Sequence, residues 1–207
     1  GAKDPLTRRA LSSTKVMTNW AMRNVVQAWL DKHPGVTPDG WDSRELLEPS
    51  KDDGTRTFDD EGDVGVLRTW RAMCPELQER WPEAARPEYW DGVTIENGRV
   101  VELELEEFDL TGAVPAEIGR LSALRTLNLG YNELTSVPAE IGQLTSLEEL
   151  RLNHNQLTSV PAEIGQLTSL TVLDLRLNPL TSLPAEVGQL ASLEQLVLVD
   201  NELTSLP

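Results

Sequence analysis

The chain has 207 residues, of which 39% are hydrophobic, and its formal net charge is −16 at pH 7. Its one cysteine, Cys74, and its two histidines, His33 and His154, exclude an intrachain disulfide and are too few for a structural zinc site without carboxylate ligands. No run of about eighteen apolar residues occurs, so neither a membrane span nor membrane binding is expected, and the acidity argues against nucleic-acid binding.

Residues 1–34 are basic, with six Lys/Arg against two Asp/Glu. Four apolar side chains in this segment recur at the spacing of one helix face: Met22, Val25, Val26 and Trp29. Pro34 follows where such a helix would end. The segment therefore predicts one amphipathic helix.

Short motifs in this segment resemble the C-terminal half of a U-box, the zinc-free relative of the RING finger in ubiquitin ligases. The matching elements are Pro5-Leu6-Thr7, Asn19, Ala21-Met22-Arg23-Asn24 and Trp29. The resemblance implies that a ubiquitin-conjugating enzyme is contacted, in a complete domain, by Pro5, Leu6, Asn19 and Arg23. The loop and central helix of a U-box have no counterpart here, so we expect these 207 residues alone not to stimulate ubiquitin discharge. The alternative is an amphipathic helix unrelated to U-boxes.

Residues 35–63 are rich in aspartate, glycine and proline. Such a composition offers little apolar surface to bury and many turn positions. We expect an acidic linker there.

Residues 64–98 are predicted to form a small cap. Asp63 is expected to N-cap a helix whose apolar positions are Val66, Leu67, Trp70, Met73 and Leu77. The run Trp90-Asp91-Gly92-Val93-Thr94 follows, and Asn97-Gly98 predicts a tight hairpin turn into Val100.

This region is similar to the N-terminal cap that precedes plant and protist leucine-rich repeats. We expect Trp70, Trp81 and Trp90 to form the core of the cap, with Cys74 buried and unreactive. Secreted plant versions usually place a disulfide cysteine after Trp-x-Gly-Val, where this chain has Thr94. We therefore expect an intracellular, cytoplasmic protein.

Residues 99–207 consist of about five copies of one pattern. The leading leucines Leu124, Leu147, Leu170 and Leu193 stand 23 residues apart, and each opens the pattern L-x-x-L-x-L-x-x-N-x-L. The alternating leucines predict a short strand in each copy with the leucines inward. Glycines also recur at the repeat spacing, at Gly119, Gly142, Gly165 and Gly188, which predicts turns and not a phosphate-binding loop.

This pattern is the signature of the leucine-rich-repeat family. The resemblance implies an α/β fold: a right-handed solenoid with a parallel concave sheet and short helical turns or extended coil on the convex side, preceded by the cap and a small, mainly helical N-terminal segment. The pattern is incomplete at Pro207, so we expect more repeats in the natural protein and self-association of this chain through its open end.

One asparagine in each copy is expected to bond the backbone of a neighbouring coil through a buried amide. We call Asn132, Asn155, Asn178 and Asn201 the asparagine ladder. The first copy has Phe108 at this position, so the ladder is expected to begin at Asn132, and Phe108 to act by packing. The first copy also returns through Thr111-Gly112-Ala113-Val114-Pro115, one residue longer than later returns and similar to plant-type repeats.

The side chains between the inward leucines are expected to form the concave face, and they vary while the framework barely changes. The expected protein-binding residues are Glu102, Glu104, Thr126, Asn128, Tyr131, Glu149, Arg151, Asn153, His154, Asp174, Arg176 and Leu177. The glutamates suit a basic partner segment, and the aromatic and arginine positions have the residue types of binding hot spots. The alternative is a solvated face without a partner.

The sequence contains no constellation that indicates catalysis, a metal or a cofactor. The leading hypothesis is a protein-interaction module that recruits substrates to a U-box-type ubiquitin ligase. The alternative is a non-enzymatic scaffold or signalling protein.

Overall fold

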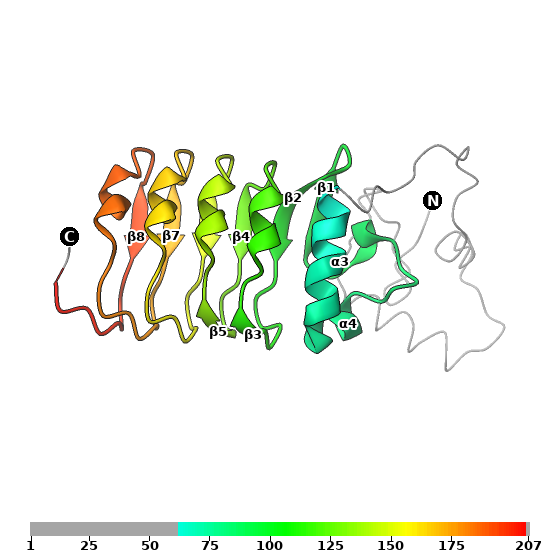
Figure 1. Ribbon diagram of the computed structural model, residues 1–207, viewed down its shortest axis with the longest axis horizontal. Coiled ribbons are helices and arrows are strands. Elements are labelled where there is room, and N and C mark those ends of the chain that lie inside the picture. The colour runs from blue at the N-terminus through cyan, green and yellow to red at the C-terminus, as the bar shows by residue number, and fades with distance from the viewer. Residues whose placement is uncertain (1–61, 206–207) are drawn as a thin grey trace, which may run out of the picture. The chain divides into compact units, whose positions relative to one another are not determined.

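The computed structural model describes residues 62–205, drawn in colour in Figure 1. The U-box-like segment at 1–34, with Pro5, Leu6, Asn19 and Arg23, lies outside the described residues, as does the linker up to residue 61. In Figure 1 the cap precedes a row of coils that continues to the C-terminal end. The description below concerns this unit alone.

The cap consists of two short helices, one 3-10 turn and a β-hairpin. Its elements are α3 (Asp63–Met73), α4 (Pro75–Arg80), η1 (Pro87–Tyr89), β1 (Val93–Glu96) and β2 (Arg99–Glu104). Asn97 and Gly98 have φ angles of 51° and 78°, and both therefore lie in the left-handed region that a tight two-residue hairpin turn requires. The expected turn at these residues is confirmed.

Two expectations for the cap helix are wrong. Gly62, not Asp63, is the N-cap residue of α3, and the Asp63 carboxylate instead accepts hydrogen bonds from the side chain of Arg99 and the N–H of Val100, each at 2.9 Å. The helix ends before Cys74-Pro75, because proline cannot continue it, and a second helix starts. Met73 is consequently 56% exposed.

The three tryptophans form the core of the cap, as expected. Trp70, Trp81 and Trp90 are 1%, 0% and 4% exposed, and the rings of Trp81 and Trp90 stack with centroids 5.1 Å apart. Each indole N–H of this stacked pair also reaches a backbone carbonyl, that of Asp91 and that of Pro82 respectively. The pair is therefore buried without an unpaired donor.

The repeats stack strand upon strand to form one sheet. The concave strands after β2 are β4 (Thr126–Asn128), β6 (Glu149–Arg151), β7 (Val172–Asp174) and β8 (Gln195–Val197). Their order is β1-β2-β4-β6-β7-β8; only the cap hairpin is antiparallel. Leu127, Leu150, Leu173 and Leu196 pair in register, which is the 23-residue sequence period expressed in space.

The convex side is built from single 3-10 turns: η2 (Ala116–Arg120), η3 (Ala139–Gln143), η4 (Ala162–Gln166) and η5 (Ala185–Gln189). A proline immediately precedes each turn. The repeated glycines lie within these turns, as expected. A Cβ on Gly142 would lie 2.5 Å from the carbonyl oxygen of Glu163 in the next coil, so glycine is needed because neighbouring coils approach closely there.

A second, two-stranded parallel sheet pairs β3 (Thr111–Ala113) with β5 (Glu133–Ser136). It occurs where the first coil makes its longer return, and the sequence did not predict it. At the other end of the described residues, Leu196 and Val199 are 40% and 62% exposed because no described coil follows them. Self-association through this end stays a prediction.

Candidate functional site

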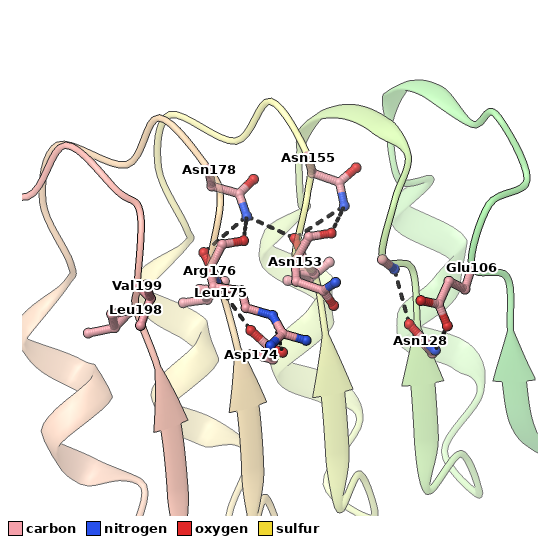
Figure 2. Close-up of polar contacts among 12 residues, drawn as sticks. Glu106, Asn128, Asn153, Asn155, Asp174, Leu175, Arg176, Asn178, Leu198 and Val199 are labelled. Atoms are coloured by element: carbon pink, nitrogen blue, oxygen red, sulfur yellow. Dashed lines mark hydrogen bonds and ion pairs between the residues drawn. The ribbon is translucent and has the colours of Figure 1, made fainter.

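The asparagine ladder fixes the edge of the concave face. The Asn155 side chain donates to the carbonyl oxygen of Leu129 in the preceding coil at 2.8 Å and accepts the N–H of Leu134 at 2.9 Å. It also donates within its own coil, to the carbonyl oxygens of Leu152 and Asn153 (Figure 2). Asn132, Asn178 and Asn201 make the equivalent bonds to their own preceding coils.

The ladder begins at Asn132, and Phe108 takes its place in the first coil. The Asn132 Oδ1 accepts the N–H groups of both Phe108 and Leu110. Phe108 is 4% exposed, and the guanidinium of Arg80 lies 4.1 Å from its ring centroid. This aromatic side chain therefore joins the first coil to the cap, through a cation–π contact that the repeat pattern alone did not indicate.

The concave positions form rows that run across the strands. Strand register aligns Glu104, Asn128, Arg151, Asp174 and Val197. A parallel row lies two residues further along each coil: Glu106, Gly130, Asn153, Arg176 and Val199. Within the first row the side chain is acidic in the first coil, an amide in the second, basic in the third, acidic in the fourth and apolar in the fifth.

A third row lies at the residue before Phe108 and before each ladder asparagine. Glu107, Tyr131, His154, Leu177 and Asp200 all have φ between 52° and 58°, the left-handed region that non-glycine residues rarely adopt. The rings of Tyr131 and His154 stack with centroids 4.0 Å apart, and Tyr131 is 43% exposed. This turn geometry places an aromatic pair at the rim of the concave face.

The two arginines of the face are each paired within their own coil. Arg151 lies 2.7 Å from the carboxylate of Glu149, and Arg176 lies 3.2 Å from that of Asp174. Asp174 also accepts the N–H of Arg176 at 3.1 Å. The centre of the face is therefore close to electrically neutral.

The acidic charge of the face collects in the first coil. Glu102, Glu104 and Glu106 are all exposed. The Nδ2 of Asn128 donates to the carboxylates of Glu104 and Glu106, at 2.9 and 3.1 Å. Within the described residues neither of these two carboxylates forms an ion pair.

Three of the expected binding residues are almost covered. Asn128, Asn153 and Asp174 are 5%, 3% and 6% exposed, since short side chains in the middle of the sheet are flanked by neighbours on both sides. Longer or peripheral side chains, such as those of Thr126, Glu149 and Leu177, remain partly accessible. The sequence therefore indicated which residues lie along the concave strands and turns, but not how accessible each position is; that these residues bind a protein stays a prediction.

The described residues contain no group of His, Cys, Asp and Glu side chains arranged to hold a metal ion. Over residues 62–205, no helix has the length and apolar character needed to cross a membrane. Cys74 is half-buried, and burial, followed by the charge of Glu76, raises the pKa of its thiol.

Comparisons with known proteins agree with this geometry. Residues 96–207, just over half of the chain, match the family described as the leucine-rich repeat region. The BIR2 ectodomain from Arabidopsis thaliana is 26% identical over 70% of this chain and 83% of its own, with a TM-score of 0.62. A chain of the BIR3–SERK2 complex from the same plant is 27% identical over 70% and 84%, with a TM-score of 0.61. A leucine-rich-repeat protein of Leptospira interrogans is 45% identical, with a TM-score of 0.44. The match covers 46% of this chain and 24% of that protein.

Proposed function

Because the chain belongs to the leucine-rich-repeat family and carries its interaction module, we propose that its concave face binds a protein partner. The observation that carries this proposal is the contrast between framework and face. The inward leucines and ladder asparagines repeat coil after coil, whereas the aligned residues Glu104, Asn128, Arg151, Asp174 and Val197 differ in every coil. A face that served only as a solvated surface would not require such variety on an identical scaffold.

Two further observations support a protein as the ligand. The exposed Tyr131 and the arginines Arg151 and Arg176 are residue types that dominate binding energy at protein interfaces. One structure similar to this chain belongs to the BIR3–SERK2 complex, an assembly of two proteins. The acidic residues of the first coil favour a partner that presents a basic segment.

Site-specific photocrosslinking tests the proposal. Benzoylphenylalanine replaces Tyr131 on the concave face and, in a matched variant, Tyr89 in the cap; the two tyrosines are 43% and 36% exposed. We expect a discrete protein adduct from position 131 in cells, identified by mass spectrometry, and none of that mass from position 89. Equal adducts from both positions, or none from position 131, would contradict binding at the concave face.

The finer proposal is that the repeats recruit substrates to a U-box-type ubiquitin ligase, with Pro5, Leu6, Asn19 and Arg23 contributing to the contact with a conjugating enzyme. Its support is the motif resemblance within residues 1–34. The test is ubiquitination of the crosslinked partner by the natural full-length protein, with Arg23→Ala as the comparison. Ubiquitination that depends on Arg23 supports the ligase, and a bound partner that is never modified favours the scaffold alternative. The lone cysteine supports an intracellular location as part of the same proposal.

A further inference from the structure

The backbone at the rim of the concave face takes the same left-handed conformation in every coil. Bonds between the coils fix it: the N–H of Tyr131 donates to the carbonyl oxygen of Asn153 at 2.9 Å, and that of His154 to the carbonyl oxygen of Arg176 at 3.0 Å. Glycine, asparagine and aspartate tolerate this conformation best, and a bulky residue with positive φ is an outlier. The fold therefore gives no reason for a tyrosine with a φ of 52° at position 131.

Only one face of the Tyr131 ring is covered. The His154 ring of the following coil stacks on it within 15° of parallel, with centroids 4.0 Å apart. Because Tyr131 is nevertheless 43% exposed, its accessible surface lies on the ring edge and on the opposite face, which is turned toward the first coil. Neighbouring strands are about 4.8 Å apart, more than the two centroids, so Tyr131 leans away from the first coil and leaves room on this side. Between described residues, the cation–π contact that forms is at Phe108 and not at this open face.

A carboxylate stands beside this open face. Glu107 has the position of Tyr131 in the preceding coil, and its N–H donates to the carbonyl oxygen of Gly130 at 3.2 Å. Its side chain is exposed and forms no ion pair with any of residues 62–205. The face of an aromatic ring and a carboxylate both attract a cation, so the two neighbouring groups favour the same kind of ligand.

One arginine lies close by, and its charge is already engaged. Arg80 donates to the carbonyl oxygen of Glu107 at 2.9 Å and pairs with the carboxylate of Asp91 at 3.4 Å. Glu106 and Asp109, near Glu107 in the chain, are exposed and add negative charge. The surroundings of the open face are therefore acidic and complement a basic ligand.

We propose that an arginine side chain of the partner protein lies against the open face of Tyr131 and pairs with Glu107. A guanidinium is planar, so it stacks on an aromatic face while its N–H groups, which lie in the plane, reach a carboxylate at the side. The compact ammonium of lysine lacks this geometry, and an anionic side chain would be repelled. This inference rests on the proposed function and specifies one residue of the bound segment.

Random dodecapeptides displayed on phage provide the probe. They are selected on the 207-residue chain after removal of those that bind the double variant Tyr131→Leu/Glu107→Gln, and the affinity of the most enriched peptide is measured by fluorescence anisotropy. We expect this peptide to contain arginine and to bind about tenfold more weakly to Tyr131→Leu, whereas Tyr131→Phe keeps the ring face and should bind within about twofold of the parent. Glu107→Gln should weaken binding about fivefold and reduce its dependence on salt. Glu202→Gln removes an exposed charge in the last coil and is the control, with an expected change below about twofold.

Replacing the peptide's arginine by citrulline removes the charge and keeps the length of the side chain. The citrulline peptide should bind the parent about tenfold more weakly and lose no further affinity on Tyr131→Leu, because both changes remove the same contact. A variant that had only lost its fold would weaken both peptides alike, so this comparison separates recognition from stability. A selection that enriches no arginine peptide, or equal losses of both peptides on Tyr131→Leu, would overturn the inference. Either result leaves the proposed function intact provided that benzoylphenylalanine at position 131 still crosslinks to a protein, whereas loss of that crosslink refutes the proposed function itself.

Discussion

Replacing Asn155 by alanine tests the ladder at a coil with neighbours on both sides. The carbonyl oxygens that its amide contacts keep other donors, since Leu129 also accepts from Asn132, and Leu152 also accepts from Asn178. The N–H of Leu134 is different, because the Asn155 Oδ1 is its partner in the buried interior. The loss is therefore close to one unsatisfied buried donor, about 1–3 kcal/mol in the free energy of unfolding.

Urea denaturation followed by circular dichroism measures this loss, and thermal scans should show a midpoint lower by about 2–12 °C for a unit of this size. Asn201→Ala is the matched control. It removes the same kind of bond, to the N–H of Leu180 at 3.3 Å, but at a partly exposed site where water can replace the amide. We expect Asn201→Ala to cost clearly less. An Asn155→Ala variant with an unchanged midpoint, or the reverse order of the two losses, would refute the reasoning.

Three further predictions concern the cap and its junction with the first coil. Phe108→Ala should cost about 3–5 kcal/mol in urea denaturation, because it removes a ring that is 4% exposed; a loss below 1 kcal/mol would contradict its packing role. Gly92→Ala should lower the free energy of unfolding more than Gly98→Ala. Both glycines have positive φ, but only at position 92 would a Cβ lie 2.1 Å from a carbonyl oxygen, that of Glu104. Equal losses of stability would argue against this clash. Burial and then the charge of Glu76 raise the pKa of the Cys74 thiol, so less of it is thiolate at pH 8 than in a free cysteine peptide. Its rate of disulfide exchange with an aromatic disulfide reagent should therefore be lower than that of the peptide at pH 8 and approach it only at higher pH. An equal rate at pH 8 would contradict the shift.

The repeat region was predictable because its information is local and periodic. Alternating leucines specify a strand and its inward face, and the 23-residue period alone aligns Leu127, Leu150 and Leu173 in the sheet. Asn97-Gly98 specified its turn for a similar reason, since few residue pairs tolerate two positive φ angles. These features need no knowledge of distant contacts.

What was missed depends on contacts between distant residues. Asp63 has the residue type and position of an N-cap, but Arg99 and Val100, brought close only by the folded hairpin, bind its carboxylate instead. Met73 continues the apolar spacing of its helix and is nonetheless exposed, because the break at Pro75 removes the surface on which it would pack. Local pattern cannot distinguish such cases from their alternatives.

The last residue of each concave strand shows the same limit. Asn128 and Asp174 each accept the N–H of the residue two positions later, whereas Arg151 and Val197 have no acceptor atom with which to do so. Whether this N–H is bonded within its own coil therefore depends on one variable position of an otherwise repeated framework, and the period that predicts the strands does not predict it.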